Sequence, residues 1–265
     1  LGLEAAGRII ALGEGVSGYA EGDRVAYMGP GLGAYSTHRV MPAEALFKLP
    51  ESVSDDIAAA AILKAATTEG LVERCADVEA GDTVLVHAAA GGVGLIMVQW
   101  LKALGVNVIG TVSSDAKEKL AREAGCDLVI RYDREEIAPL VRHFTHGAGV
   151  PVVFDGVGKD TFEASLDSMS PRGLLVSFGN ASGPVDGVNL GLLAQKGSLF
   201  VTRPTLMHYY MTPEDRSAGI ARVWDMLGSG KVKVTIGQTY ALKDAAQAHI
   251  DLEARRTTGS TILKP

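Results

Sequence analysis

The stretch that decides the fold is TVLVHAAAGGVGLIMVQWL, residues 83–101. Its first residues, rich in Val and Leu, predict a buried strand, and a tight turn of Ala and Gly leads into a helix that is apolar nearly all round. Small residues such as Gly91, Gly92 and Gly94 let the backbone approach a pyrophosphate, whose charge the helix N-terminus stabilises. Ala89 replaces the first glycine of the usual G-x-G-x-x-G pattern. An ordinary strand–turn–helix corner is the alternative, but a second strand at 107–112 favours a dinucleotide site.

The end of that second strand indicates which dinucleotide binds. NAD enzymes usually carry an Asp or Glu about 20 residues after the glycines, where it accepts from the ribose 2′-OH. This chain has Ser113 and Ser114 there, followed by Lys117. Hydroxyl groups and an ammonium group would hold a 2′-phosphate, so the predicted cofactor is NADPH. We interpret Asp115 as an acid that favours the helix N-terminus, and a solvated surface lysine is the alternative for Lys117.

The composition argues against several classes of protein. The chain has 265 residues, of which 47% are hydrophobic, enough for one large core or two moderate ones. Its net charge of −6 argues against nucleic acid as the main partner, and no apolar run approaches the roughly 20 residues that span a bilayer. The cysteines, Cys75 and Cys126, cannot build a disulfide scaffold and fit a reducing cytoplasm. The histidines are scattered, so we expect no metal site.

The order of the elements predicts an α/β protein. Residues 1–50 read as short strands and turns, and a helical linker over 55–76 follows. From residue 83 to about 203, strands alternate with helices, which predicts a doubly wound parallel sheet. Its strands are expected at 83–88, 106–112, 128–131, 151–155, 173–178 and 198–202, and its helices near 92–104, 115–124, 134–144 and 160–169.

The two ends of the chain are expected to form the β-rich part. Strands are predicted near 7–13, 24–27 and 34–40, then at 231–234, 238–241 and 260–263, with helices at 213–228 and 243–254. The predicted domains are 1–64, 65–203 and 204–265. Because the sequence enters a β-rich stretch at Leu1 without an initiator Met, we expect that a segment before it is missing.

Several motifs together resemble the zinc-free quinone oxidoreductases, the zeta-crystallin branch of the medium-chain dehydrogenase/reductase superfamily. The matching segments are residues 2–7, 22–25, 33–36, 87–94, 177–183 and 202–204. The resemblance implies a Rossmann-type doubly wound parallel sheet and a GroES-like β-rich domain truncated at its N-terminus. It also implies that zinc is absent, because Leu3 stands where the zinc alcohol dehydrogenases carry a histidine.

The resemblance implies a set of cofactor-binding residues. Those implied at the pyrophosphate are Gly91, Gly92, Val93 and Gly94, and those at the 2′-phosphate are Ser113, Lys117 and Tyr132. Those implied near the nicotinamide and its ribose are Thr67, Phe178, Gly179, Asn180, Ala181, Pro204 and Thr205, and Arg255 is implied as a tail arginine that reaches the cofactor. The alternatives are a half-buried surface aromatic for Tyr132, a turn-former for Asn180, and a solvated pair for Arg255 and Arg256.

The segment Thr68-Glu69-Gly70 departs from the family, which commonly has aromatic residues there. Glu69 therefore stays unassigned, and no side chain is assigned as a proton donor.

The activity implied is NADPH-dependent reduction of quinones in the cytoplasm, by hydride transfer without zinc. The alternatives are a 2-alkenal or enoyl reductase and a non-catalytic NADPH-binding protein. In relatives, the strand corresponding to 198–202 pairs across a two-fold axis, so a homodimer is expected through this apolar edge. The alternative is that the helix near 213–228 covers the strand within one chain.

Overall fold

The computed structural model describes residues 1–29, 31–254 and 256–265. The chain forms two compact units, which we describe separately. The first consists of Leu1–Ala66 and Ser217–Pro265, and the second of Thr67–Arg216. By contacts, residues 204–216 thus group with the second unit, whereas the sequence assigns them to the C-terminal domain. No helix among the described residues is both long enough and apolar enough to cross a membrane.

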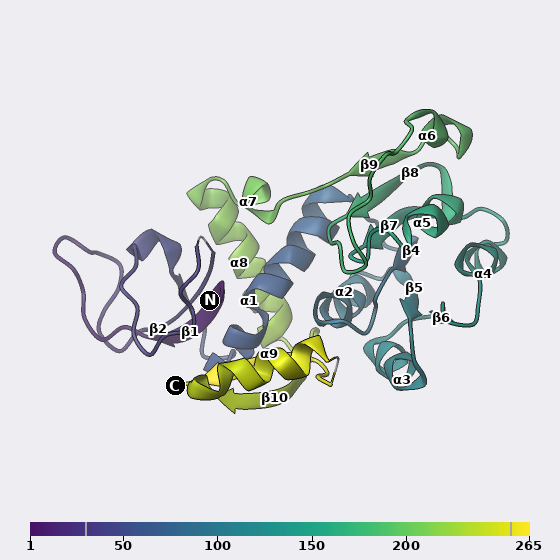
Figure 1. Cartoon of the computed structure of the whole chain (residues 1–265). Helices are drawn as coiled ribbons and strands as arrows, with labels where there is room; N and C mark the ends of the chain where they lie inside the picture. Colours follow the sequence, from purple (N-terminus) through teal and green to yellow (C-terminus); the bar gives the residue numbers. More distant parts are fainter. Residues whose placement is uncertain (30, 255) are drawn as a thin grey trace. The chain divides into compact units, whose positions relative to one another are not determined.

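The second unit is built on a six-stranded sheet in which every pair of neighbouring strands is parallel (Figure 1). The spatial order is β6 (Leu128–Arg131), β5 (Asn107–Val112), β4 (Thr83–Val86), β7 (Val150–Asp155), β8 (Met169–Ser177) and β9 (Phe200–Thr202). The chain therefore winds outward from β4 to one edge and then from β7 to the other. This order confirms the doubly wound sheet, and its switch point lies between β4 and β7, where such sheets bind ligands at their carboxyl ends.

Helices cover both faces of this sheet. They are α2 (Gly92–Ala103), α3 (Asp115–Ala124), α4 (Ile137–Phe144) and α5 (Phe162–Ser168), followed by the short α6 (Gly191–Gln195) and α7 (Leu206–Tyr209). Leu85, Ile109 and Leu175 are fully buried in one core cluster with residues of α4 and α5. Their neighbours along the strands point to the opposite face, where α2 packs against α3. Burial on both faces explains why these strands are continuous apolar runs.

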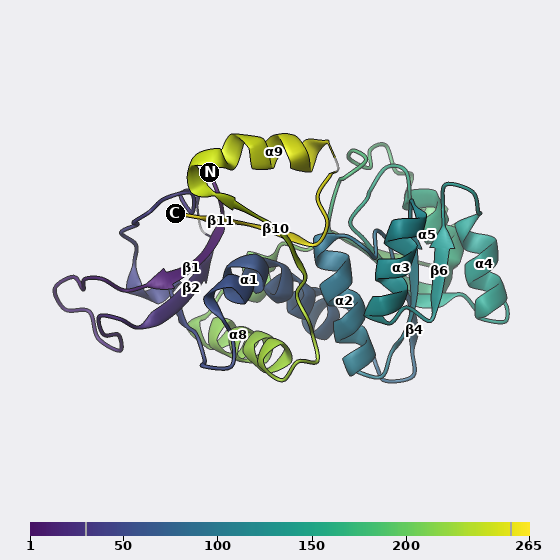
Figure 2. The same cartoon turned by 90° about the horizontal axis from the view of Figure 1, so that it is seen from below.

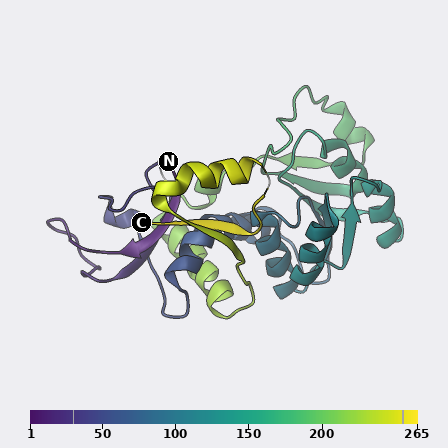
Figure 3. The same cartoon turned by 60° about the horizontal axis from the view of Figure 1, so that its bottom comes forward.

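The first unit contains two small sheets. The antiparallel sheet has the order β1 (Glu4–Arg8), β2 (Arg24–Met28) and β3 (Phe47–Lys48). The parallel pair is β10 (Ile236–Ala241) and β11 (Ser260–Lys264), with α9 (Ala245–Glu253) packed on β10 (Figures 2 and 3, yellow-green and yellow). Two long helices, α1 (Asp55–Glu69) and α8 (Pro213–Gly228), belong mostly to this unit, which also has the 3-10 turns η1 (Ala43–Ala45) and η3 (Leu242–Asp244).

Two expected strands of this unit are wrong, and a third is displaced, since β1 ends at Arg8 whereas a strand was expected near 7–13. Residues 34–40 form no strand, because the backbone N–H groups of Ala34 and Tyr35 donate to Gly2 and Leu1 in an irregular turn. Residues 231–234 also form no strand, and Val232 N donates to the end of α8 instead. The expected linker helix over 55–76 is present as α1, continued by a π-helical segment, η2 (Gly70–Cys75).

Candidate functional site

In the turn between β4 and α2, the backbone of Gly94 lies close to the backbone of Ala88 and Ala89. Ala88 adopts a φ of +52°, and its carbonyl accepts from Gly91 N at 2.8 Å. A Cβ added at Gly94 would lie 2.3 Å from Ala88 O, so only glycine fits where α2 crosses the turn. No side chain caps α2 at Gly91, and the first N–H groups of a helix have no intrahelical partner. The turn formed by Gly91, Gly92, Val93 and Gly94 therefore fits an anion such as a pyrophosphate.

The predicted 2′-phosphate residues gather at the ends of β5 and β6. Lys117 Nζ lies 3.3 Å from Ser113 Oγ, and the side chain of Lys117 is exposed. Ser114 caps α3 by accepting from Lys117 N. Tyr132 follows β6, where its N–H donates to Val112 O at 3.2 Å, and it is 46% exposed. Hydroxyl groups, an aromatic ring and an ammonium group thus share one corner of the sheet.

Asp115 has partners that the sequence did not reveal. Its carboxylate, on the first turn of α3, accepts hydrogen bonds from Arg131 and Arg134. These bonds hold the pKa of Asp115 below its ordinary value. Arg131 also pairs with Asp133 at 2.8 Å. The guanidinium groups of Arg131 and Arg134 therefore offset the charge of Asp115 in part, and Arg131 also lies 4.0 Å from the Glu118 carboxylate.

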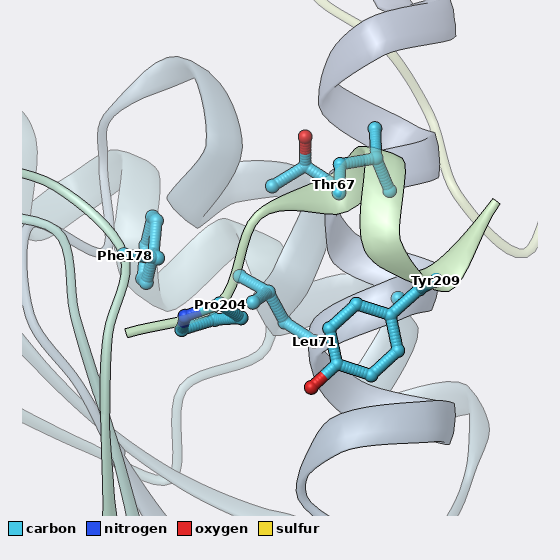
Figure 4. A pocket seen from close by; sticks show the side chains of 7 residues that line it. Thr67, Leu71, Phe178, Pro204 and Tyr209 are labelled. Carbon is cyan, nitrogen blue, oxygen red and sulfur yellow. The ribbon is translucent and has the colours of Figure 1, made fainter. Parts of the chain in front are cut away.

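A pocket of about 180 Å³ lies within the second unit, next to the carboxyl edge of the sheet (Figure 4). It brings together Thr67, Phe178 and Pro204, three predicted residues from distant parts of the chain. The lining residues that sequence reasoning missed are Gly70, Leu71, Leu206 and Tyr209. Its volume is below the roughly 300–1,000 Å³ of most small-molecule sites. It therefore fits one ring-sized group rather than a whole dinucleotide.

The polar groups of this pocket come from Thr67 and Tyr209. A hydrogen bond with Cys75, together with burial, raises the pKa of Tyr209 to about 12. The Tyr209 hydroxyl is therefore engaged with Cys75, on the η2 side of the pocket.

The loop after β8 packs tightly on the loop after β7. A Cβ at Gly179 would lie 2.3 Å from Gly156 O, and Phe178 N donates to Asp155 O at 2.8 Å. Asn180 and Ala181 are exposed, and the Asn180 carbonyl accepts from Gly183 N, a turn that fits the alternative interpretation of Asn180. Thr205 is exposed immediately before α7. Arg255 lies outside the described residues.

A buried polar network supports these loops. The Asp155 carboxylate is 1% exposed and accepts from the N–H groups of Val157 and Gly158, at 2.8 and 3.0 Å. Ser165 Oγ donates to Asp155 at 2.9 Å and lies 3.0 Å from His87 Nε2. Burial lowers the pKa of His87, although the Asp155 charge works against this shift. Because Ser165 stands between the carboxylate and the imidazole, the arrangement is not that of a nucleophilic triad.

Two family models match the sequence. The zinc-binding dehydrogenase model covers residues 92–225, and the alcohol dehydrogenase GroES-like domain model covers residues 1–51. The first name implies a zinc ion. Within residues 1–29, 31–254 and 256–265, no three His, Cys, Asp or Glu side chains are grouped so that they could hold a metal. The described residues therefore do not fit zinc.

The chain is similar over its whole length to proteins named quinone oxidoreductase. It is 52% identical over 265 residues to one from Pseudomonas aeruginosa, covering 82% of that protein. A quinone oxidoreductase crystal structure from Pseudomonas syringae matches with a TM-score of 0.96 and 53% identity. A crystal structure of Escherichia coli quinone oxidoreductase complexed with NADPH matches with a TM-score of 0.96 and 46% identity. Each structure covers the whole of this chain, which covers 82% of theirs. The chain belongs to the quinone oxidoreductase branch of the medium-chain dehydrogenase/reductase superfamily.

Proposed function

We propose that this protein is an NADPH-dependent quinone oxidoreductase. The observation that carries the proposal is the pocket, which joins Thr67, Phe178 and Pro204 at the carboxyl edge of a doubly wound sheet. A relative with 46% identity and a TM-score of 0.96 is titled as a complex with NADPH. When bound, the nicotinamide cofactor supplies a hydride to the acceptor.

The chain's own residues would hold the two ends of the cofactor. The N–H groups of the turn at Gly91–Gly94 would bind the pyrophosphate, and Ser113, Lys117 and Tyr132 would bind the 2′-phosphate. Residues implied at the nicotinamide end are Thr67, Phe178, Gly179, Asn180, Ala181, Pro204, Thr205 and Arg255. Since a quinone is itself electrophilic, the protein contributes mainly by positioning the reacting groups.

Turnover with matched acceptors tests this function. Oxidation of NADPH, followed by stopped-flow absorbance, is expected with 1,4-benzoquinone, and oxidation of a simple alcohol by NADP⁺ is not. Alcohol oxidation without quinone reduction would contradict the proposal. Faster turnover of an α,β-unsaturated aldehyde than of quinones would favour a 2-alkenal reductase. Tight NADPH binding without turnover of any acceptor would favour a non-catalytic role.

The exposed edge of the sheet supports a homodimer. β9 is an edge strand, and Phe200 and Val201 are 57% and 41% exposed on it. An apolar strand edge of this kind is normally covered, and self-pairing across a two-fold axis closes at two subunits. We also place the protein in the cytoplasm, which suits the unpaired Cys75 and Cys126. Sedimentation at micromolar concentration is expected to give the mass of a dimer.

A further inference from the structure

Glu69 is a buried carboxylate that the function proposed above does not use. It is the last residue of α1 and is 3% exposed. Its Oε1 accepts from Arg74 Nε at 2.7 Å, and its Oε2 accepts from the Tyr210 hydroxyl at 2.9 Å. A carboxylate is retained at such a place only when charged and hydrogen-bonding partners compensate for its lost hydration.

Arg74 extends this contact to a distant segment. Its Nη1 donates to Tyr209 O at 3.0 Å, and its Nη2 donates to Asp215 O at 3.1 Å. The guanidinium also lies 5.1 Å from the centre of the Tyr210 ring. Burial and the Glu69 carboxylate raise the pKa of Tyr210, so its hydroxyl remains a donor. We call Glu69, Arg74 and Tyr210 the Glu69 clamp.

The clamp holds two walls of the pocket against each other. One wall is η2, with Gly70 and Leu71, and the other is α7, with Leu206 and Tyr209. A Cβ added at Gly70 would lie 3.2 Å from Leu206 Cδ1, so the two walls touch at this glycine.

By itself α7 is a weak element. It has four residues, and the side chain of its N-cap residue, Thr205, makes no capping bond. A single helical turn gains too little from its own hydrogen bonds to be stable alone. Contacts with the surrounding residues must therefore hold α7 in position. The Glu69 clamp supplies such a contact, because the Arg74 guanidinium donates to the carbonyl of Tyr209 at the C-terminal end of α7.

We propose that Glu69 is a positioning residue that fixes α7 through Arg74 and Tyr210, and thereby sets which acceptors the pocket admits. This inference rests on the proposed function, because it assigns the pocket to the acceptor and nicotinamide end of that site. If it holds, loosening the clamp changes the selectivity between acceptors of different size. It leaves the phosphate end, at Gly91–Gly94 and Lys117, unaffected.

Two variants of the full chain and one control test this proposal. Tyr210→Phe removes one hydrogen bond but keeps the ring under Arg74, and it is the milder variant. Glu69→Gln removes the charge. The control is Asp127→Asn, an exposed carboxylate that is also bound to a cation (Lys102, 2.8 Å) and to a backbone N–H (Val108, 2.7 Å). Asp127 immediately precedes β6 and so lies at the amino edge of the sheet, whereas the pocket is at its carboxyl edge.

The first readout is the ratio of kcat/KM for compact 1,4-benzoquinone to that for bulky 9,10-phenanthrenequinone. Misplacing the pocket wall is expected to lower kcat/KM for the compact acceptor about tenfold or more, mostly through KM, and so to shift the ratio. The NADPH dissociation constant should change less than kcat/KM does, because the residues proposed to bind the two phosphate groups lie outside the pocket. Simple loss of folded protein lowers both rates equally and leaves the ratio unchanged, as is expected for Asp127→Asn. An unchanged ratio in a folded Tyr210→Phe or Glu69→Gln variant would overturn the proposal.

The second readout, hydrogen–deuterium exchange, needs no turnover. Amides of residues 206–210 should exchange about tenfold faster in Glu69→Gln than in the wild type, with no such change in Asp127→Asn. Unchanged exchange there would refute the clamp. If the wild type reduced no quinone, the proposed function would fail, and the selectivity role with it. The exchange result would then still decide whether the clamp holds α7.

Discussion

We expect Gly94→Ala to weaken the fold and the binding of NADPH together. An added Cβ would lie 2.3 Å from Ala88 O and 2.8 Å from the Ala89 carbonyl, and these are backbone atoms that cannot rotate away. Because ordinary contacts begin at 3.4 Å, the start of α2 must move by about 1.1 Å from the turn. Overpacking of this kind costs about 1–3 kcal/mol of unfolding free energy.

The same movement shifts the N–H groups proposed to bind the pyrophosphate. Loss of one well-placed hydrogen bond to a charged group costs about 1.5–3 kcal/mol, so the NADPH dissociation constant should rise by about 10- to 150-fold. Urea unfolding followed by circular dichroism measures the first effect, and fluorescence titration with NADPH the second. The control is Gly7→Ala, since a Cβ at Gly7 meets nothing within 4 Å. A Gly94→Ala protein with wild-type stability and affinity would refute the reasoning.

Three further perturbations test separate parts of the molecule. Lys117→Ala should weaken NADPH binding by about 1–3 kcal/mol in titrations and leave NADH nearly unchanged, because only NADPH carries the 2′-phosphate; equal losses would mean that the lysine acts elsewhere. Since burial lowers the pKa of His87, the unfolded chain binds a proton below about pH 6.5 that the folded protein does not. Stability should therefore fall by up to about 1.4 kcal/mol between pH 7.5 and 5.5 in urea melts, and this loss should be missing in His87→Gln; equal pH slopes would contradict it. Phe200→Lys should give monomers in sedimentation experiments, because it places a charge on the exposed edge strand β9, and a wild-type monomer at micromolar concentration would exclude the dimer.

The parallel sheet could be predicted because its signals are local. Strands buried on both faces are apolar runs, and glycine-containing turns separate them from amphipathic helices. The largest shift is in β8, which begins at Met169 rather than at residue 173. Arg172 has a φ of +61° there, and the pairing of β7 with β8 changes register between Val150 and Val152. An irregularity of this kind leaves no mark in the hydrophobic pattern.

The β-rich unit was predicted less well because its pairing is not local. The segment 34–40 contains Tyr35, Thr37 and Val40, residue types that are common in strands, but contacts with distant residues determine its structure. The N–H of Tyr35 donates to Leu1, more than thirty positions earlier in the chain. β-propensity states only that a segment fits a pleated surface, and it does not supply the partner strand.

The candidate site shows the same difference between features set by local sequence and features set by distant contacts. The predicted phosphate end is local, since Ser113 and Lys117 are four residues apart and the glycine turn is contiguous. At the other end, Glu69 in a largely apolar helix implies a compensating partner by the rule that buried charges are paired. That rule does not choose among the 25 lysines and arginines of the chain. In the structure the partners of Glu69 are Arg74, five residues later in the chain, and Tyr210, which is 141 residues away. Asp115 shows the same effect. From the sequence its charge is explained by the helix N-terminus, whereas in the structure it also pairs with Arg131 and Arg134, which are distant in the chain. Sequence reasoning therefore predicts where the cofactor's phosphates would bind, whereas the pocket at the other end depends on contacts that only the folded chain makes.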